Sequence, residues 1–298
     1  MDDPRRDPEA DASGGAERGD GRTIVVTGGS DGIGAAAARQ LVERGHRVLL
    51  VGRSPEKTAA VARRLDVEHW SADFARLDEV AALAVALRGA ADRIDVLANN
   101  AGGVFGPRRI TPDGNELTFQ VNHLAPFLLT QLLLEPLEAG AGIVVNTASS
   151  AARLLARPDL DDLTAERGYT PARAYGTAKL ANIWHARGLL ARHGDAGIRP
   201  VAFDPGNVRT GFAARSTSVL RLVYRTPLAR LMLMSPERGG ANLAFFADGT
   251  PGTTWQPGAF YSQTTLATPE ETNPLVHADG LVDLLWERSE ALVAPWLA

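Results

Sequence analysis

The 298-residue sequence contains no cysteine. Disulfides, thiolate metal sites and cysteine nucleophiles are therefore excluded, and the composition fits a reducing compartment, so we expect a cytoplasmic protein. Lysine is nearly as scarce, because 31 basic residues include just two lysines, Lys57 and Lys179. A lysine that falls within a motif therefore carries more weight here than in an average chain.

Long apolar runs and a strong charge bias are also missing. No stretch of about 18 consecutive apolar residues occurs, so no membrane-spanning helix is expected. The formal net charge is −4, which gives no indication of nucleic-acid binding. The six histidines show neither H-x-H nor H-x-x-x-H pairing, so we expect no metal site.

The composition that remains is that of a soluble globular protein, with 45% hydrophobic and 22% charged residues. It leaves enough apolar side chain for a sizeable core. Residues 1–21 are rich in Asp, Arg, Gly and Pro and lack the apolar segment of a signal peptide, so we predict a disordered lead-in. No linker interrupts residues 22–298, which we expect to form a single domain.

From residue 23 onward, short apolar runs alternate with helical patterns. Apolar, non-alternating strands separated by helices are typical of a parallel sheet covered on both faces. Right-handed crossovers then predict a doubly wound, Rossmann-type α/β fold with a mostly parallel sheet. Strands are predicted at 23–27, 47–51, 67–70, 94–98, 142–146, 199–203 and 259–261. Helices are predicted at 35–42, 55–65, 77–87, 114–138, 172–192, 236–247 and 281–293.

A glycine-rich turn, Thr27-Gly-Gly-Ser-Asp-Gly-Ile-Gly34, follows the first strand and opens the first helix. Glycines let the backbone approach a pyrophosphate, and a helix start offers unpaired N–H groups and a positive dipole end. The turn therefore predicts a dinucleotide site, although alone it could simply close a strand onto a helix. The candidate cofactor residues here are Gly28, Ser30, Asp31, Gly32, Ile33 and Gly34.

The end of the second strand bears on the choice of cofactor. An NAD-binding chain usually carries an acid here for the ribose 2′-hydroxyl, whereas this chain has Arg53, which could pair with a 2′-phosphate. The sequence thus favours NADP(H) over NAD(H), although Asp31 would repel the phosphate. Asp73, with the adjacent Phe74, is expected beside the adenine. Arg53 and Asp73 could also be ordinary solvated side chains.

Tyr175 and Lys179 lie four residues apart on a predicted helix and so share one face. A phenol has a reference pKa of roughly 10. A cation held beside it favours the phenolate and lowers that pKa. The pair is a candidate proton donor and acceptor, although Tyr-x-x-x-Lys spacing also occurs often by chance.

The order of several motifs resembles the short-chain dehydrogenase/reductase family. They are the turn at 27–34, Asn99-Asn100-Ala101-Gly102, Asn122, Ser149-Ser150, Tyr175 with Lys179, and Pro205-Gly206. The resemblance covers about residues 22–298. Within the family the chain is most similar to the retinol dehydrogenase and WW-domain oxidoreductase branch. The signs are residues 121–130, the 25-residue spacing from Ser150 to Tyr175, residues 235–237 and residues 285–290.

The resemblance implies a catalytic tetrad. Tyr175 would be the general acid in reduction and the base in oxidation. Ser150 would hydrogen-bond the substrate oxygen, with Ser149 as the competing choice. Lys179 would lower the phenol pKa and hold the nicotinamide ribose, and Asn122 would hold a water linking Lys179 to solvent.

The resemblance also implies further cofactor contacts and a reaction. Asn100, Ala101 and Gly102 would pass beside the adenosine half, and Pro205, Gly206, Val208 and Thr210 would run along the nicotinamide. The implied function is an NADP(H)-dependent alcohol dehydrogenase or carbonyl reductase. The alternative is a non-catalytic NAD(P)-binding sensor or scaffold, whose expected mark is a lost Tyr or Lys. A light-driven tetrapyrrole reductase, whose sequences look similar, is disfavoured because it relies on cysteines and this chain has none.

A substrate lid is expected near residues 211–235. Val104, Phe105, Phe212 and residues 219–234 would line the open end of the sheet and favour an apolar alcohol or carbonyl substrate. The same stretch could instead be a helix packed on the core. Its interleaved arginines could touch a membrane surface, but a solvated lid face is favoured. By resemblance, helices 114–138 and 172–192 would pair copies into a homodimer or homotetramer.

Overall fold

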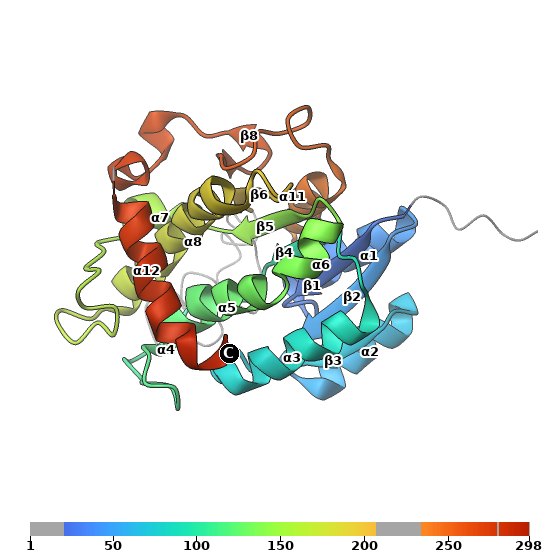
Figure 1. Cartoon of the computed structure of the whole chain (residues 1–298), viewed down its shortest axis with the longest axis horizontal. Coiled ribbons are helices and arrows are strands. Elements are labelled where there is room, and N and C mark those ends of the chain that lie inside the picture. The colour runs from blue at the N-terminus through green and yellow to red at the C-terminus, as the bar shows by residue number, and fades with distance from the viewer. Residues whose placement is uncertain (1–20, 207–233, 279, 298) are drawn as a thin grey trace, which may run out of the picture.

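The computed structural model describes residues 21–206, 234–278 and 280–297 of the chain. Its central feature is an eight-stranded sheet in the order β3-β2-β1-β4-β5-β6-β7-β8 (Figure 1). Pairings from β3 through β7 are parallel, and β8 runs antiparallel to β7. Helices cover both faces, which confirms the doubly wound, Rossmann-type α/β fold.

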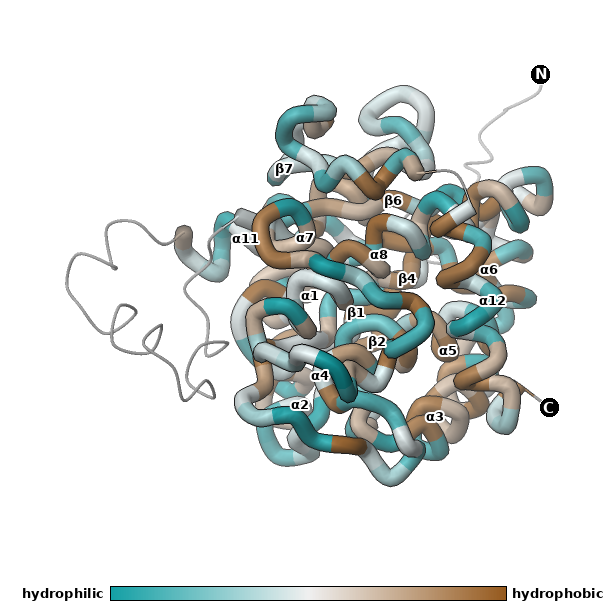
Figure 2. The backbone as a smooth tube through the Cα atoms, turned by 90° about the vertical axis from the view of Figure 1, so that its left-hand side faces the viewer, coloured by the Kyte–Doolittle hydropathy of each residue, from teal (hydrophilic) through white to brown (hydrophobic). Residues whose placement is uncertain are grey.

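The strands are short, and those in the middle of the sheet are buried on both faces. They are β1 (Thr23–Thr27), β2 (Arg47–Gly52), β3 (His69–Ser71), β4 (Val96–Asn99), β5 (Ile143–Thr147), β6 (Arg199–Asp204), β7 (Phe260–Ser262) and β8 (Thr265–Leu266). Apolar segments run through the strands at the middle of the molecule (Figure 2). The predicted third strand was placed too early, because Val67 still closes the preceding helix by donating to the carbonyl of Ala62 (3.1 Å).

Two helical layers enclose the sheet. One face packs against α1 (Gly32–Glu43), α2 (Pro55–Leu65) and α11 (Pro236–Asp248). The other face packs against α3 (Leu77–Ala90), α5 (Ala125–Leu132), α8 (Pro171–His193) and α12 (Leu281–Val293), of which α3, α5 and α12 face the viewer in Figure 1. The shorter helices are α4 (Leu117–Phe119), α6 (Leu134–Ala139) and α7 (Ala151–Leu154), with single 3₁₀ turns at Pro269–Glu271, Pro274–His277 and Ala294–Trp296.

The helix predicted at 114–138 is wrong as a continuous helix. Gly114 has φ +85° in the preceding turn, and Glu116 caps the true start by accepting from the N–H groups of Thr118 and Phe119. After α4 the chain makes a π-helical turn, Gln120–Leu124, and a second break falls at Leu133. Pro126 has no N–H to continue an α-helical ladder, which is a physical cause for the irregular turn before it.

Most of the lid expected at 211–235 and most of the lead-in expected at 1–21 lie outside the described residues. Of the lid, residues 234 and 235 are described, and Ser235 caps α11. Within the described part, no helix has both the length and the apolar character needed to cross a bilayer.

Candidate active site

The sheet register gathers the predicted site residues at one edge. β1 pairs with β2 and β4, and β5 pairs with β4 and β6, all in parallel. The turns that follow these strands therefore lie side by side at their carboxyl ends, where doubly wound folds bind ligands.

The turn after β1 is shaped by close backbone approach. Gly28 has φ +69°, and a Cβ there would lie 2.9 Å from Nδ2 of Asn100. A Cβ on Gly34 would collide with the carbonyl oxygen of Gly28. Asn100 fastens the turn from the end of β4, because its Nδ2 donates to the carbonyl of Thr27 (2.9 Å). Glycine is thus required at both positions by packing and backbone conformation.

The start of α1 fits a bound phosphate. Asp31 caps the helix, because its Oδ1 accepts from the N–H of Gly32 (2.7 Å). The N–H groups of Ile33 and Gly34 belong to the first turn and have no intrahelical acceptor. Together with the glycine cradle, these donors and the positive helix end suit a dinucleotide pyrophosphate. Ser30 lies in this turn and close to the end of β2, because a Cβ placed on Gly52 would lie 3.1 Å from Oγ of Ser30.

The residues predicted to lie near the ribose and adenine follow β2 and β3. Arg53 is exposed at the end of β2. Oδ1 of Asp73 accepts from the N–H of Ala75 (3.1 Å). No contact within the described residues uses Oδ2, so this oxygen can accept a further hydrogen bond. Phe74 is buried, and its carbonyl accepts from Nε2 of Gln120 (3.3 Å). Its ring and its carbonyl are therefore engaged within the protein.

Tyr175 and Lys179 lie one turn apart on α8, as predicted. Both are buried, and Nζ of Lys179 lies 5.6 Å from the centroid of the Tyr175 ring. Nζ also donates to the carbonyl of Thr147 at the end of β5 (2.9 Å). Burial lowers the pKa of Lys179 to about 7, and the nearby Asp204 carboxylate acts in the opposite direction. The lysine is therefore a group that can change charge near neutral pH.

Asn122 lies fully buried in the π-helical turn, with its amide group occupied. Oδ1 accepts from the N–H of Gly103 (3.1 Å), while Nδ2 donates to the carbonyls of Gly103 (2.9 Å) and Thr118 (2.8 Å). The side chain therefore clamps the loop after β4. Its Oδ1 keeps a second lone pair for a further donor.

The backbone carbonyl of Asn122 is different. Its α-helical donor would be residue 126, which is Pro126 and has no N–H. Lys179 lies near the side chain of Asn122, since a Cβ on Gly102 would lie 2.5 Å from Oδ1 of Asn122 and 3.3 Å from Nζ of Lys179. The carbonyl and Oδ1 of Asn122 are thus both acceptors that a bridging water could use.

The two serines after β5 have different partners. Oγ of Ser149 accepts from the N–H of Ala151 (3.2 Å), a local turn contact. The N–H of Ser150 donates to Oδ2 of Asp204 (3.0 Å), and the presence of Ser150 opposes the rise that burial causes in the pKa of Asp204. The structure therefore links Ser150, and not Ser149, to the end of β6.

Asp204 was missed from the sequence as a site residue, although it ends a buried strand directly before Pro205-Gly206. Its Oδ1 accepts from the N–H of Gly206 (3.0 Å), which has φ +87°. The carbonyl of Pro205 accepts from Nδ2 of Asn242 on α11 (3.2 Å). The Pro205-Gly206 turn is therefore fixed by Asp204 at the end of β6 and by Asn242 on α11. Thr147, the acceptor of Lys179, was missed because the contact uses its backbone.

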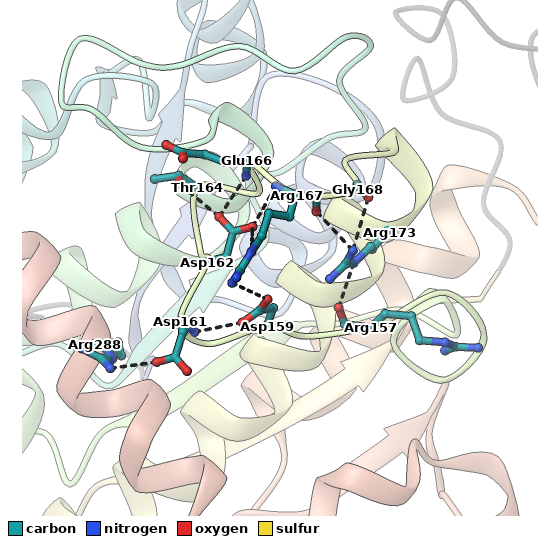
Figure 3. Close-up of polar contacts among 10 residues, drawn as sticks. All are labelled: Arg157, Asp159, Asp161, Asp162, Thr164, Glu166, Arg167, Gly168, Arg173 and Arg288. Carbon is teal, nitrogen blue, oxygen red and sulfur yellow. Dashed lines mark hydrogen bonds and ion pairs between the residues drawn. The ribbon is translucent and has the colours of Figure 1, made fainter.

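The loop before α8 is held by its own polar contacts (Figure 3). Arg173 donates to the carbonyls of Arg157 (2.9 Å), Arg167 (3.4 Å) and Gly168 (3.3 Å). Asp162 accepts from the N–H groups of Glu166 and Arg167 (2.9 Å each), and the first of these bonds is the main cause that lowers its pKa. The loop thereby anchors the first turn of α8 through Arg173, two residues before Tyr175.

Tyr169 lies in this loop, away from the lysine. Its hydroxyl donates to the carbonyl of Gly106 (2.9 Å), and burial raises its pKa. Of the predicted substrate-lining residues, Val104 and Phe105 lie partly buried in the loop after β4. Val208, Thr210, Phe212 and residues 219–233 lie outside the described residues. In the described part of the chain, no three His, Asp or Glu side chains gather in a way that could hold a metal ion.

Comparisons with known proteins place the chain among oxidoreductases. A family model described as short chain dehydrogenase matches residues 22–220. A protein of Streptomyces sp. (strain C5) named "Putative daunorubicin C-13 ketoreductase DnrU" is 41% identical over 280 residues, covering 92% of this chain and 93% of that protein. Retinol dehydrogenase 13 of Homo sapiens is 35% identical over 229 residues, covering 73% of this chain and 69% of that protein. The resemblance to retinol dehydrogenases is confirmed.

Solved structures show the same fold. An uncharacterised protein of Mycobacterium paratuberculosis has a TM-score of 0.72 and 30% identity, with 92% of this chain and 93% of that chain covered. Pseudomonas aeruginosa RhlG, solved as an NADP active-site complex, has a TM-score of 0.66 and 28% identity, with 81% and 94% covered.

Proposed function

Because the chain belongs to the short-chain dehydrogenase/reductase family, we propose that it reduces the carbonyl group of an apolar small molecule with NADPH and oxidises the alcohol in reverse. The observation that carries this proposal is the pairing of Tyr175 with Lys179 on α8, where Nζ lies 5.6 Å from the ring centroid. The pair lies at the sheet edge that also carries the glycine turn.

The nicotinamide supplies the hydride when the cofactor is bound, and the protein's own side chains handle the proton. Tyr175 donates its phenolic proton to the carbonyl oxygen, so that hydride and proton together turn C=O into CH–OH. Ser150 hydrogen-bonds the same oxygen. Lys179, when charged, stabilises the phenolate and holds the ribose. A water on the carbonyl of Asn122 returns a proton through Lys179.

The cofactor residues proposed from the sequence fit this scheme. Gly28, Gly32 and Gly34 keep the backbone close to the pyrophosphate, while the N–H groups at the start of α1 bind its oxygens. Asp73 and Asn100-Ala101-Gly102 border the adenosine half, and Pro205-Gly206 borders the nicotinamide. The preference for NADP(H) rests on exposed Arg53 at the end of β2, where no acid follows. The NADP complex of RhlG supports it.

An apolar substrate is supported by two observations. The loop after β4 presents Val104 and Phe105 near the catalytic edge. The names of the relatives refer to daunorubicin, which contains a fused ring system, and to retinol, which is an apolar polyene alcohol. A ketone or aldehyde attached to a ring system or polyene is therefore the proposed substrate class.

The function is tested by following NADPH oxidation with a panel of polycyclic ketones, retinal, aryl ketones and aliphatic aldehydes. Tyr175→Phe should lower kcat/KM at least about 100-fold, because it removes the proton donor. Tyr169→Phe is the matched control, since it deletes the same atom in the neighbouring loop, and it should stay within a few-fold of wild type. NADPH binding without turnover on the whole panel would instead support a sensor.

A further inference from the structure

Asp204 is a buried carboxylate at the carboxyl end of β6, with 8% of its surface exposed. A carboxylate is costly to bury unless its oxygens are hydrogen-bonded. Both oxygens are used here: Oδ1 accepts from the N–H of Gly206 (3.0 Å) and Oδ2 from the N–H of Ser150 (3.0 Å). The charge is thus held by two turns that meet at the catalytic edge.

The same carboxylate faces two catalytic candidates. The backbone N–H of Ser150 donates to it, and the ammonium of Lys179 interacts with it electrostatically. Lys179 and Tyr175 are on α8, and Ser150 follows β5. Burial raises the pKa of Asp204, and the hydrogen bonds from Gly206 and Ser150 oppose that rise. Asp204 therefore connects the substrate-binding serine with the lysine that holds the cofactor.

We propose that Asp204 is a positioning residue that fixes the backbone of Ser150, so that the serine hydroxyl is placed for the substrate oxygen. This inference rests on the proposed function and extends it by one residue. A serine hydroxyl has a single proton, which it must donate to a substrate carbonyl, whereas a carboxylate only accepts hydrogen bonds. By holding the N–H of Ser150 together with that of Gly206, the carboxylate fixes the turn that carries the hydroxyl and leaves its proton for the substrate. The Ser150 oxygen is then directed before the substrate binds, which reduces the entropy lost on binding.

The test is a double-mutant cycle of Asp204→Asn and Ser150→Ala, measured as kcat/KM for the best carbonyl of the panel with saturating NADPH. Asp204→Asn alone should lower kcat/KM roughly 10- to 100-fold, the range expected for a hydrogen bond to a charged group. If Asp204 acts through Ser150, the same change in a Ser150→Ala background should cost less than about 3-fold. If the fold-losses in kcat/KM of the two single variants multiply in the double variant, the proposal is overturned.

Asp95→Asn is the matched structural control. Asp95 holds the N–H of Thr23 through Oδ2 (2.8 Å) at the opposite end of the sheet, so its loss should lower the urea midpoint and leave kcat/KM unchanged. Should Asp204→Asn fail to fold, Asp204→Ser takes its place, because its shorter hydroxyl cannot reach the N–H groups of both Ser150 and Gly206. A wild-type protein without turnover would refute the proposed function, whereas turnover with multiplicative losses refutes the role of Asp204 alone.

Discussion

Replacing Lys179 by methionine should stabilise the cofactor-free protein while abolishing its turnover. Lys179 is buried, and burial lowers its pKa from 10.5 to about 7. Below pH 7 the folded protein therefore carries a charged ammonium in a site that disfavours the charge. Methionine keeps the length of the side chain and removes the charge.

The size of the effect follows from the pKa. The fall of the Lys179 pKa from 10.5 to about 7 corresponds to roughly 5 kcal/mol. The variant loses the bond from Nζ to the carbonyl of Thr147, worth about 1 kcal/mol. That carbonyl keeps a second donor, because Nδ2 of Asn182 also reaches it (3.0 Å). The net gain in the free energy of unfolding at pH 6 is therefore about 4 kcal/mol.

The gain must depend on pH in a defined direction. The pKa of Lys179 is lower in the folded than in the unfolded state, so between about pH 7 and 10 the unfolded chain binds more protons. Wild-type stability therefore rises with pH in that window, and the advantage of Lys179→Met shrinks. Urea unfolding at pH 6, 8 and 9.5 measures this, with Lys57→Met on exposed α2 as the control. An advantage that is independent of pH, or absent at pH 6, would refute the reasoning.

Three further outcomes are expected. Lys179→Ala should lower kcat/KM roughly 100-fold or more, whereas Lys57→Ala, on an exposed helix face, should change it less than about 2-fold; similar losses would contradict the assignment. Arg53→Ala should raise KM for NADPH about 10- to 100-fold and leave KM for NADH unchanged; a wild-type preference for NADH would mean that Asp31 dominates the ribose pocket. Gly34→Ala should weaken NADPH binding by about 10-fold or more without unfolding the protein, because its Cβ collides with the carbonyl of Gly28; unchanged affinity by fluorescence titration would disprove the close-approach argument.

Elements set by local patterns were predictable from the sequence. The bounds of β1, α2 and α12 were predicted residue for residue, because each has a clear apolar pattern. For α2, the capping Ser54 and Pro55 at the first helical position also mark the start. The glycine turn and the Tyr175–Lys179 spacing were readable for the same reason.

Features that depend on contacts between distant segments were not predictable. Pro126 is a local signal for the break in the helix predicted at 114–138, but the contact between the Asn122 amide and Gly103, a residue of another loop, has no such signal. Asp204 belongs to the site because its carboxylate accepts from the N–H of Ser150, which lies 54 residues earlier in the chain. The amide of Asn100 proved to fasten the glycine turn, a role that its motif alone did not indicate.

Transfer of deuterium from NADPH deuterated at C4 of the nicotinamide tests the central claim most directly. The account predicts that wild type places one deuterium on the carbinol carbon of the product, detected by mass spectrometry, and none on its hydroxyl after exchange into ordinary water. Tyr175→Phe should suppress the labelled product, and Tyr169→Phe should not. Product without deuterium on that carbon, or labelled product formed equally well by Tyr175→Phe, would contradict hydride transfer through this site.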